Sequence, residues 1–351
     1  MIINLTFCPD FADSIDRFVS DLRAQAEEMG MHTTFPITKA NIKEFQPKVT
    51  FTGIKKKLST DVKLKNLQMI LFLTPDKADR YSDDIYSEIK LLGDVENGLT
   101  TQCVNINSIF DKRYKKNKWN RSYLRQLMLK VNPKLGGTNV ALLDNQSLPS
   151  IFRDRSGLMI IGADVNHPAP ADKISPSIAA LVGSSDNEYS NYYTTVSMQP
   201  KSREEMIKKL DLMALELLKS YEAKNKRLPQ RIIFYRDGVS EGQFQHVIDN
   251  EYPLMAKAFH KLNPTYKPKL TFIVVQKRHH TRFMTANEGV NVPPGTVVEQ
   301  SITHKTDFDF FLCSHAGRLV SICSSNLSLN LIIFYFENSG NESFRSLLCI
   351  G

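Results

Sequence analysis

Two aspartates stand at the ends of apolar, β-prone runs, and their chemistry is the most informative feature of the chain. One run reads Ile160-Ile-Gly-Ala-Asp-Val-Asn-His-Pro168 and delivers Asp164; the other begins at Arg231 and delivers Asp237. Paired carboxylates at strand ends are the donors that two-metal phosphodiester chemistry uses. The pattern therefore predicts a metal site, and the competing structural interpretation is a pair of turn-capping aspartates.

Composition narrows the class of protein. The chain has 351 residues, 42% of them hydrophobic and 23% charged, which predicts a packed core and leaves room for two domains. A net charge of +8 favours a polyanionic partner. Five scattered cysteines without metal-ligand spacing argue against a disulfide framework or zinc site and favour a reducing compartment, the cytoplasm or the nucleus.

The N-terminus and the apolar runs give no sign of membrane targeting. Residues 1–10 lack the basic segment of a secretory signal. The longest apolar run, 327–336, is far shorter than the roughly 20 residues that span a bilayer. We therefore expect no membrane partner.

Strands and helices alternate over the first 145 residues, which predicts an α/β domain with a largely parallel sheet. The expected strands are 2–7, 69–74 and 104–107. The expected helices are 10–28, 84–92 (ending near Gly93) and 120–131.

A second domain is expected over residues 146–317. The expected strands are 158–161, 177–182, 192–198, 231–235 and 270–275. A long helix from Ser202 to Lys224 is expected between the third and fourth strands, with Ser202 and Glu205 in capping-box spacing. Three strands, a helix and another strand are the order of an RNase H-like layer, and the mainly apolar strands predict a sheet covered on both faces.

Residues 318–351 differ in character from the rest. They are rich in Ser, Asn, Leu and Ile, and the run 329–336 is uncharged and β-prone. We expect this tail to be disordered or not to be native protein sequence.

Four segments together resemble the eukaryotic Argonaute family. They are Gly162-Ala-Asp-Val-Asn-His-Pro168, Tyr235-Arg-Asp-Gly-Val-Ser-Glu-Gly-Gln-Phe244, Phe272-Ile-Val-Val-Gln-Lys-Arg-His-His-Thr-Arg282 and residues 302–317. The resemblance covers about residues 2–317. It implies a Rossmann-like MID domain (1–145) followed by an incomplete RNase H-like PIWI domain (146–317). The family's N and PAZ domains and the C-terminal portion of PIWI have no counterpart in this sequence.

The resemblance implies catalytic roles for Asp164, Glu205 and Asp237, with Mg²⁺ or Mn²⁺ held by the two aspartates. Glu204 competes for the role of Glu205, and a helix N-terminal carboxylate is the structural alternative. The family's fourth ligand, a His or Asp in a Tyr-His-Val-Leu-like strand, has no match here. We therefore expect weakened metal binding and impaired cleavage, together with an exposed apolar surface where the rest of PIWI would pack.

Guide RNA binding is implied by two further sets of residues. The set expected to hold the 5′-monophosphate end is Tyr86, Lys90, Gln102, Lys130 and Lys134. The set expected on the guide backbone is Lys277, Arg278, His280, Arg282 and His315. The alternatives are an amphipathic helix with surface lysines and a solvated basic turn. The loop 75–84 is longer than in the family, which leaves the first-base preference open, and 112–118 is expected to be an exposed loop.

Three hypotheses follow. The favoured one is a small-RNA-guided silencing protein that binds a guide and presents it to target RNA, with impaired slicing. The alternatives are an active Mg²⁺-dependent RNA-guided endoribonuclease and a non-functional truncated or mis-spliced product. The resemblance also implies tryptophan-rich silencing scaffold proteins as partners.

Overall fold

The computed structural model describes residues 2–5, 15–31, 42–44, 67–74, 82–105, 109, 121–141, 149–153, 157–277, 279–286, 290–305, 308–314 and 330–337. The chain divides into two compact units, Met1–Asn139 and Val140–Gly351, and each is described by itself. The sequence-based boundary at residue 145 lies a few residues later. The described helices include none with the length and hydrophobicity of a membrane-spanning segment.

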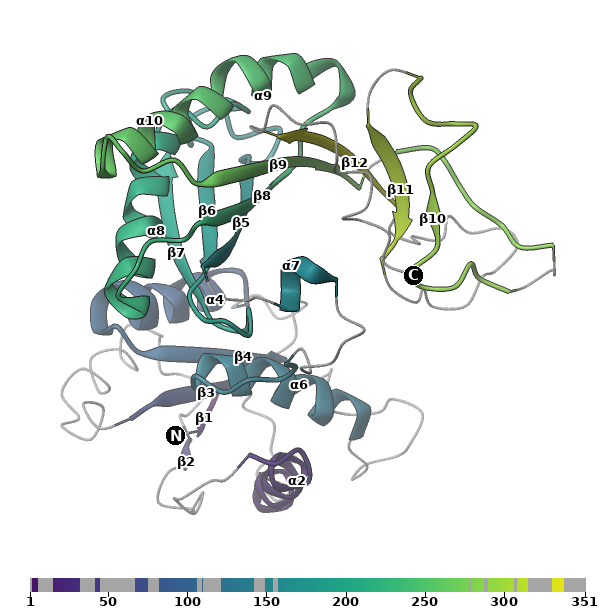
Figure 1. The fold of residues 1–351 in the computed structure, drawn as a ribbon. Coiled ribbons are helices and arrows are strands. Elements are labelled where there is room, and N and C mark those ends of the chain that lie inside the picture. Colours follow the sequence, from purple (N-terminus) through teal and green to yellow (C-terminus); the bar gives the residue numbers. More distant parts are fainter. Residues whose placement is uncertain are drawn as a thin grey trace. The chain divides into compact units, whose positions relative to one another are not determined.

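The first unit contains a parallel four-stranded sheet in the order β2-β1-β3-β4 (Figure 1). Its strands are β1 (Ile2–Asn4), β2 (Ile42–Glu44), β3 (Met69–Thr74) and β4 (Thr100–Asn105). Its helices are α2 (Ile15–Glu28), α4 (Ser82–Lys90), the π-helix η3 (Leu91–Asn97) and α6 (Arg121–Lys134).

Both faces of this sheet are covered because successive side chains of a strand point to opposite sides. Leu71 and Leu73 of β3 pack in one cluster with α2 and α6. Ile70 and Phe72 pack in another cluster with Ile89 of α4 and with η3. This arrangement is a doubly wound, Rossmann-like layer.

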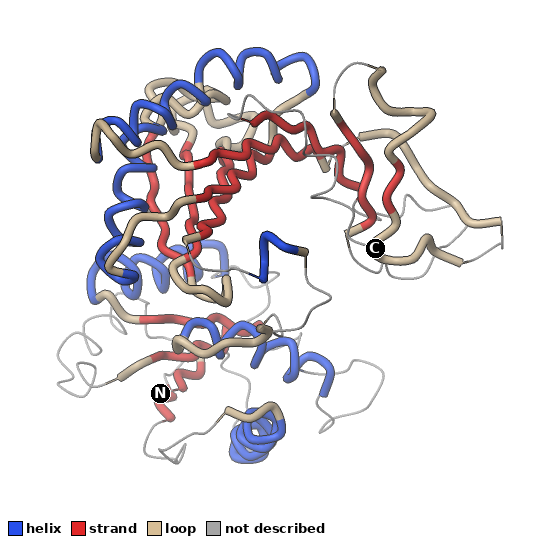
Figure 2. Tube along the Cα trace, viewed as in Figure 1, coloured by secondary structure: helices blue, strands red, loops and turns tan. Residues whose placement is uncertain are grey.

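The second unit is built on a mixed eight-stranded sheet in the order β10-β11-β12-β9-β8-β5-β6-β7 (Figure 2). Its strands are β5 (Leu158–Asn166), β6 (Ile178–Ser184), β7 (Tyr192–Met198), β8 (Arg231–Asp237), β9 (Lys269–Gln276), β10 (Val297–Val298), β11 (Asp309–Cys313) and β12 (Asn330–Glu337). The helices are α7 (Ser150–Arg153), α8 (Leu210–Asn225), the short 3-10 helix η4 (Glu241–Gln243), α9 (Phe244–Asn250) and α10 (Tyr252–Leu262).

Strand directions define the RNase H-like part of this sheet. The strands β5, β6 and β7 are successively antiparallel, and β8 runs parallel to both β5 and β9. The predicted order of three strands, a helix and a further strand is therefore confirmed.

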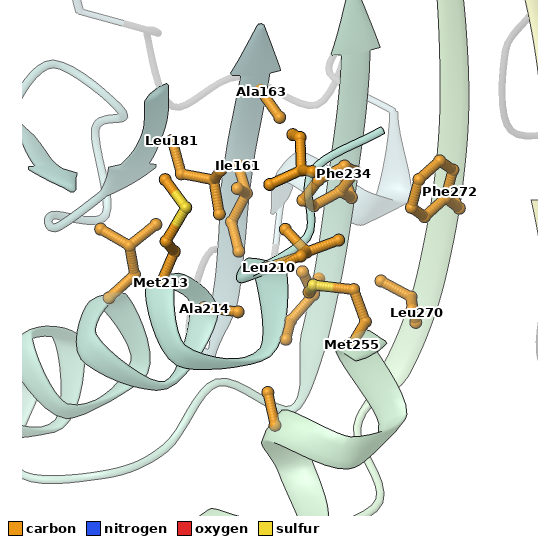
Figure 3. Packing of buried hydrophobic residues seen from close by; sticks show 14 of the residues in the cluster. Ile161, Ala163, Leu181, Leu210, Met213, Ala214, Phe234, Met255, Leu270 and Phe272 are labelled. Carbon is orange, nitrogen blue, oxygen red and sulfur yellow. The ribbon is translucent and has the colours of Figure 1, made fainter. Parts of the chain in front are cut away.

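One face of this sheet is covered by α8 and α10 over a large apolar core (Figure 3). Phe234 and Phe272 stack there with ring centroids 4.6 Å apart. Each fully buried side chain of this size contributes about 1.5–3 kcal/mol relative to an exposed one. The core therefore holds β8 and β9 firmly in place just before Asp237, which ends β8, and Lys277, which follows β9.

Three sequence-based expectations need correction. The helix predicted from Ser202 begins only at Leu210, because the main chain of residues 203–207 bonds to side chains of other elements instead of to itself. The helix predicted to end near Gly93 continues as η3 to Asn97. Residues 330–337 of the tail form β12 between β9 and β11, because their β-prone run fits two strands that need a partner. The rest of the tail (318–329 and 338–351), residues 315–317 before it, and the segments 75–81 and 112–118 lie outside the described residues.

Apolar side chains are exposed on the other face of β6 and β7. Val196 and Met198 are each 68% exposed, and Ile178 is 43% exposed. Ile178 pairs with Met198, so these side chains are neighbours. The predicted coverage of both sheet faces is therefore wrong at β6 and β7, where an apolar surface is exposed.

Candidate nucleic-acid and metal sites

The two aspartates lie at the same level of neighbouring strands. Ala163 of β5 pairs with Arg236 of the parallel strand β8, so the next residues, Asp164 and Asp237, stand side by side at the sheet edge. Neighbouring strands are about 4.8 Å apart. Asp164 is exposed, and Asp237 is partly buried. The fold thus brings together the pair that the sequence singled out.

Glu205 reaches the same place from the loop before α8. An ideal Cβ on Gly238 would lie 3.1 Å from Asp164 Oδ1 and 3.6 Å from Glu205 Oε1, so both carboxylates converge on this glycine. Gly238 has a φ of +90°, a conformation that glycine adopts without strain. A side chain at this position would be strained and would fill the space between the carboxylates. Glu204 instead pairs with Lys208 at 3.3 Å on the surface.

Arg236 fastens the Glu205 loop to β8. Its guanidinium is fully buried and forms a salt bridge with the equally buried Glu251, with Nε 2.9 Å from Oε2. It also donates to the Glu205 carbonyl at 2.6 Å and to Glu205 Oε1 at 3.2 Å. Glu251 in turn accepts the amide hydrogen of Ile207 at 2.9 Å. Charged groups this deep are tolerated only when paired, and here the pairing fixes the loop.

Positive or polar groups already face the carboxylates. Lys277 Nζ lies 2.5 Å from Asp237 Oδ2, and His167 Nε2 lies 2.7 Å from Glu205 Oε2. Within the described residues no group of three or more His, Cys, Asp or Glu side chains is arranged to hold a metal ion. The carboxylates converge on Gly238, but one oxygen of Asp237 and one oxygen of Glu205 are already bound by Lys277 and His167.

Two observations fit a divalent cation at the aspartates. Asp237 Oδ1 is buried and has no hydrogen-bond partner among the described residues. Asp164 Oδ1 and Glu205 Oε1 converge on the glycine that follows Asp237. Carboxylate oxygens are the donors that Mg²⁺ and Mn²⁺ prefer. The donor set therefore fits such an ion, provided that Lys277 gives way.

The expected guide-backbone set is only partly brought together. Lys277 is exposed, and its ammonium contacts the Asp237 carboxylate. His280 is exposed, and Arg282 is exposed with its guanidinium donating to the carbonyls of His279 and Thr281. Arg278 and His315 lie outside the described residues.

In the first unit, two ammonium groups converge on the start of β4. Lys90 at the end of α4 donates to Thr101 Oγ1 at 3.1 Å. Lys134 at the end of α6 donates to the Thr101 carbonyl and to Gln102 Oε1, both at 2.9 Å. The Tyr86 ring is 57% exposed, with Lys90 Nζ 6.0 Å from its centroid. The structure thus joins four of the five residues expected at the guide 5′ end.

The fifth expected residue, Lys130, acts on this cluster through its charge. Burial and the neighbouring Lys90 charge lower the pKa of Lys134, and Lys130 contributes a smaller effect in the same direction. Burial raises the pKa of the Cys103 thiol, although both lysines oppose that rise. Among the described residues neither Lys90 nor Lys134 forms a salt bridge. The cluster therefore concentrates positive charge that no described carboxylate contacts directly, although the charge of Asp94 acts on Lys134 from a distance.

Sequence reasoning missed several residues that organise these sites. His167 and Arg236 lie inside segments that the sequence singled out, but they received no role. Thr101, Ser177 and Glu251 received no role either. Arg236 carried a usable signal, because an arginine in an otherwise apolar strand requires a buried acidic partner. Thr101 carried none, since it acts through its main-chain carbonyl as well as its hydroxyl.

Comparison with known proteins identifies the family. The Piwi domain family matches residues 69–325. The chain belongs to the Argonaute/Piwi family. The match extends past Gly317, where the sequence-based resemblance ended. Protein argonaute 7 of Arabidopsis thaliana is 36% identical to the chain over 316 residues, which are 88% of this chain and 30% of that protein.

Solved Argonaute structures share the fold. The crystal structure of Kluyveromyces polysporus Argonaute with a guide RNA has a TM-score of 0.74 at 24% identity, covering 97% of this chain and 41% of that one. The MID-PIWI domains of the N. crassa Argonaute have a TM-score of 0.58 at 26% identity, covering 78% and 72%. The fold is thus α/β, a Rossmann-like MID domain followed by an RNase H-like PIWI domain. The chain spans about a third of the length of the curated relative.

Proposed function

We propose that this chain is a small-RNA-guided silencing protein that holds the 5′-monophosphate end of a guide RNA in its first unit. The carrying observation is the convergence of Lys90 and Lys134 on Thr101 and Gln102. The guide RNA in the Kluyveromyces polysporus structure supports the proposal by similarity of fold.

The chemistry of this cluster suits a terminal phosphate. Two ammonium groups held by neutral acceptors keep their charge available for a phosphate dianion, which forms strong charge-assisted hydrogen bonds. Burial lowers the pKa of Lys134 most and the charge of Lys90 adds to this effect, and a bound anion would oppose both by favouring the charged ammonium. The exposed Tyr86 ring offers a stacking surface for the first base.

In the second unit we propose that Asp164 and Asp237 hold Mg²⁺ or Mn²⁺, with Glu205 as the third carboxylate. Such an ion would activate water and stabilise the leaving oxygen of a phosphodiester. Arg236 and His167 orient Glu205, and Gly238 keeps the space between the carboxylates open. Lys277, His280 and Arg282, with Arg278 and His315, would line the guide backbone.

Cleavage is proposed to be weak. The strand β12 stands one strand beyond β9, with Ile332 paired to Gln276 and Ile333 to Val275 at the end of the sheet that carries Asp237. Its sequence, Asn330 to Glu337, contains neither the His nor the Asp that the family uses as a fourth ligand. A site short of one ligand binds metal less tightly.

The second candidate is an active RNA-guided endoribonuclease. The observation in its favour is that Glu205 already converges with Asp164 on Gly238, held by Arg236 and His167. Complementary target RNA and tryptophan-rich scaffold proteins are the proposed partners in both cases. The proposed location is the cytoplasm, with the nucleus as the alternative.

Guide binding and cleavage are tested separately. The chain should bind a 5′-phosphorylated RNA at least tenfold more tightly than the same RNA with a 5′-hydroxyl in fluorescence anisotropy at fixed salt. Equal affinities would refute the anchoring proposal. With guide, Mg²⁺ and a complementary RNA, little cleavage is expected. Efficient cleavage that Asp237→Ala abolishes would establish the second candidate instead.

A further inference from the structure

The strand β7 forms one edge of the eight-stranded sheet, and among the described residues it pairs only with β6. Its seven residues, Tyr192-Tyr-Thr-Thr-Val-Ser-Met198, include no charged residue and no proline. The pairing with β6 runs over the whole strand without a bulge. Charged residues, prolines and bulges normally keep the edge of a sheet from pairing with other strands. The strand β7 therefore presents an edge to which another strand can be added.

Hydrogen bonds at both ends of β7 show which of its main-chain groups face outward. The amide of Ser185 donates to the Asn191 carbonyl, and the amide of Gln199 donates to the Ser177 carbonyl, both at 2.8 Å. Hydrogen-bonded and non-hydrogen-bonded pairs alternate along antiparallel strands. The odd-numbered residues of β7 therefore bond to β6. The outward N–H and C=O groups belong to the even-numbered residues 192, 194, 196 and 198.

The same even-numbered residues carry exposed apolar side chains. Thr195 is buried on the face where α8 contacts β7, so the even-numbered side chains point to the other face of the sheet. There Tyr192 is 52% exposed, and Val196 and Met198 are more exposed still. Ile178 of β6 lies beside Met198 and extends this surface. One set of residues thus offers both unpaired main-chain groups and an apolar surface.

We propose that the outer edge of β7 pairs with β7 of a second copy of this chain, antiparallel and about a twofold axis. Such an axis lets one surface serve both partners. One register pairs all four outward residues, with residue 192 opposite 198 of the second copy and residue 194 opposite 196. A shift of two residues in either direction pairs only three of them. One of these shifts also brings Pro200, which has no N–H, opposite residue 192.

The side chains around β7 complement one another in this register. Glu188 lies in the turn before β7, Lys201 follows the strand, and both are exposed. An antiparallel second copy places Glu188 of each chain close to Lys201 of the other, whereas a parallel copy would bring equal charges together. Each Tyr192 ring also meets Met198 of the second copy, and a thioether sulfur makes favourable contacts with an aromatic ring. Charge and packing therefore both favour the antiparallel pair.

Sedimentation velocity of the full chain, without RNA or metal, tests for the second copy. Protein at about 2–200 µM is appropriate because so small an interface associates weakly. Salt at about 0.15 M screens the repulsion between two chains of net charge +8. The sedimentation coefficient should rise with concentration from the monomer value toward the dimer value. A wild type that stays monomeric over the whole range would refute the proposal.

Val196→Lys places a charge on the outer edge of β7 at an exposed position and should raise the dissociation constant at least about tenfold. Met284→Lys is the matched control. It replaces another exposed apolar side chain, 89% exposed in the segment after β9, and adds the same charge. This variant should associate like the wild type. Equal weakening by the two variants would show that β7 is not the contact.

Cysteine cross-linking tests the register. The Cα atoms of a hydrogen-bonded antiparallel pair are about 5.5 Å apart, within reach of a disulfide, whereas diagonal positions are about 7–8 Å apart. Thr194→Cys and Val196→Cys should therefore cross-link when the two variants are mixed and mildly oxidised, and much less when each is oxidised alone. The oxidised wild type gives the background from its own five cysteines. Dimers without a preference for the mixed pair would overturn the proposed register. Guide binding is measured separately, so its failure would leave this result standing.

Discussion

The two units treat charge in opposite ways. In the first unit, Lys90 and Lys134 rest on the neutral oxygens of Thr101 and Gln102. In the second unit, the carboxylates face Lys277, Arg236 and His167. The lysine cluster therefore leaves its positive charge available to a ligand, whereas protein side chains already bind the carboxylates of the second unit.

This difference teaches what each site demands of a ligand. An anion that enters the lysine cluster has no protein carboxylate to displace among the described contacts, so the cluster is organised in advance for binding. A cation that enters the carboxylate cluster must compete with Lys277 for Asp237. We therefore expect phosphate recognition to be strong and metal recognition to be weak in the same molecule.

The largest expected effect concerns the buried charges behind the carboxylates. Glu251→Ala leaves the fully buried Arg236 without its main partner, which should destabilise the fold by about 3–5 kcal/mol. Urea unfolding followed by circular dichroism measures the change. The control Glu204→Ala removes the partly exposed pair with Lys208 and should cost about 0–1 kcal/mol. Equal losses would mean that Arg236 is not anchored by Glu251.

The next effect concerns the displayed charge. Lys134→Ala removes a group that would form charge-assisted hydrogen bonds to the phosphate, worth about 1.5–3 kcal/mol, so affinity for 5′-phosphorylated RNA should fall by about ten- to a hundredfold. Arg125→Ala on the same helix is the control, because it removes the same charge from an exposed residue that lies about two and a half turns before Lys134, on the opposite side of α6. Anisotropy with both RNAs should show a loss of 5′-phosphate preference only for Lys134→Ala.

A smaller effect tests the competition at Asp237. Lys277→Met removes the competing ammonium, and a partly exposed pair is worth about 0–1 kcal/mol, so Mn²⁺ affinity should rise by up to about fivefold. The increase in melting temperature on adding Mn²⁺ should be larger in the variant than in the wild type. Lys269→Met, at the opposite end of β9, should behave like the wild type. A smaller Mn²⁺ shift in Lys277→Met would show that Lys277 does not compete with the ion.

The smallest effect is a pH dependence in the first unit. Burial and Lys90 lower the pKa of Lys134, so this side chain loses its proton at a lower pH than an ordinary lysine. The 5′-phosphate is fully charged above about pH 7.5, since its second pKa is about 6. Preference for 5′-phosphorylated RNA should therefore decline as the pH rises toward the ordinary lysine value of 10.5. In Lys134→Arg the decline should be weaker, because a guanidinium keeps its charge. Parallel pH profiles would contradict the assignment.

Sequence reasoning found the elements that local pattern determines. The run 69–74 and the run 192–198 form strands with the predicted limits, because apolar and β-branched residues end there at turns or polar residues. Asp164 and Asp237 were placed together because strand ends meet at one sheet edge. In these cases the information lies within a few neighbouring residues.

Sequence reasoning failed where side chains distant in the sequence determine the backbone conformation. Residues 202–209 carry a helix pattern and a capping-box spacing, yet Ser177, Arg236 and Glu251 bind their main-chain groups and delay the helix to Leu210. Lys277 likewise was expected on the guide backbone, and nothing in the sequence indicated its contact with Asp237. Such contacts join residues that are far apart in the chain, so no local sequence pattern predicts them.

The π-helix η3 has a consequence for how related sequences are aligned. It lies between Lys90 and Thr101, and its Gly93 packs so tightly that a Cβ would fall 2.5 Å from Thr101 Cγ2. A π-helical turn takes up one more residue than an α-helical turn. A relative with an ordinary α-helix here would need a one-residue gap to keep both contacts of Thr101. Alignments should therefore be anchored separately on Lys90 and on Thr101, with that gap allowed between them.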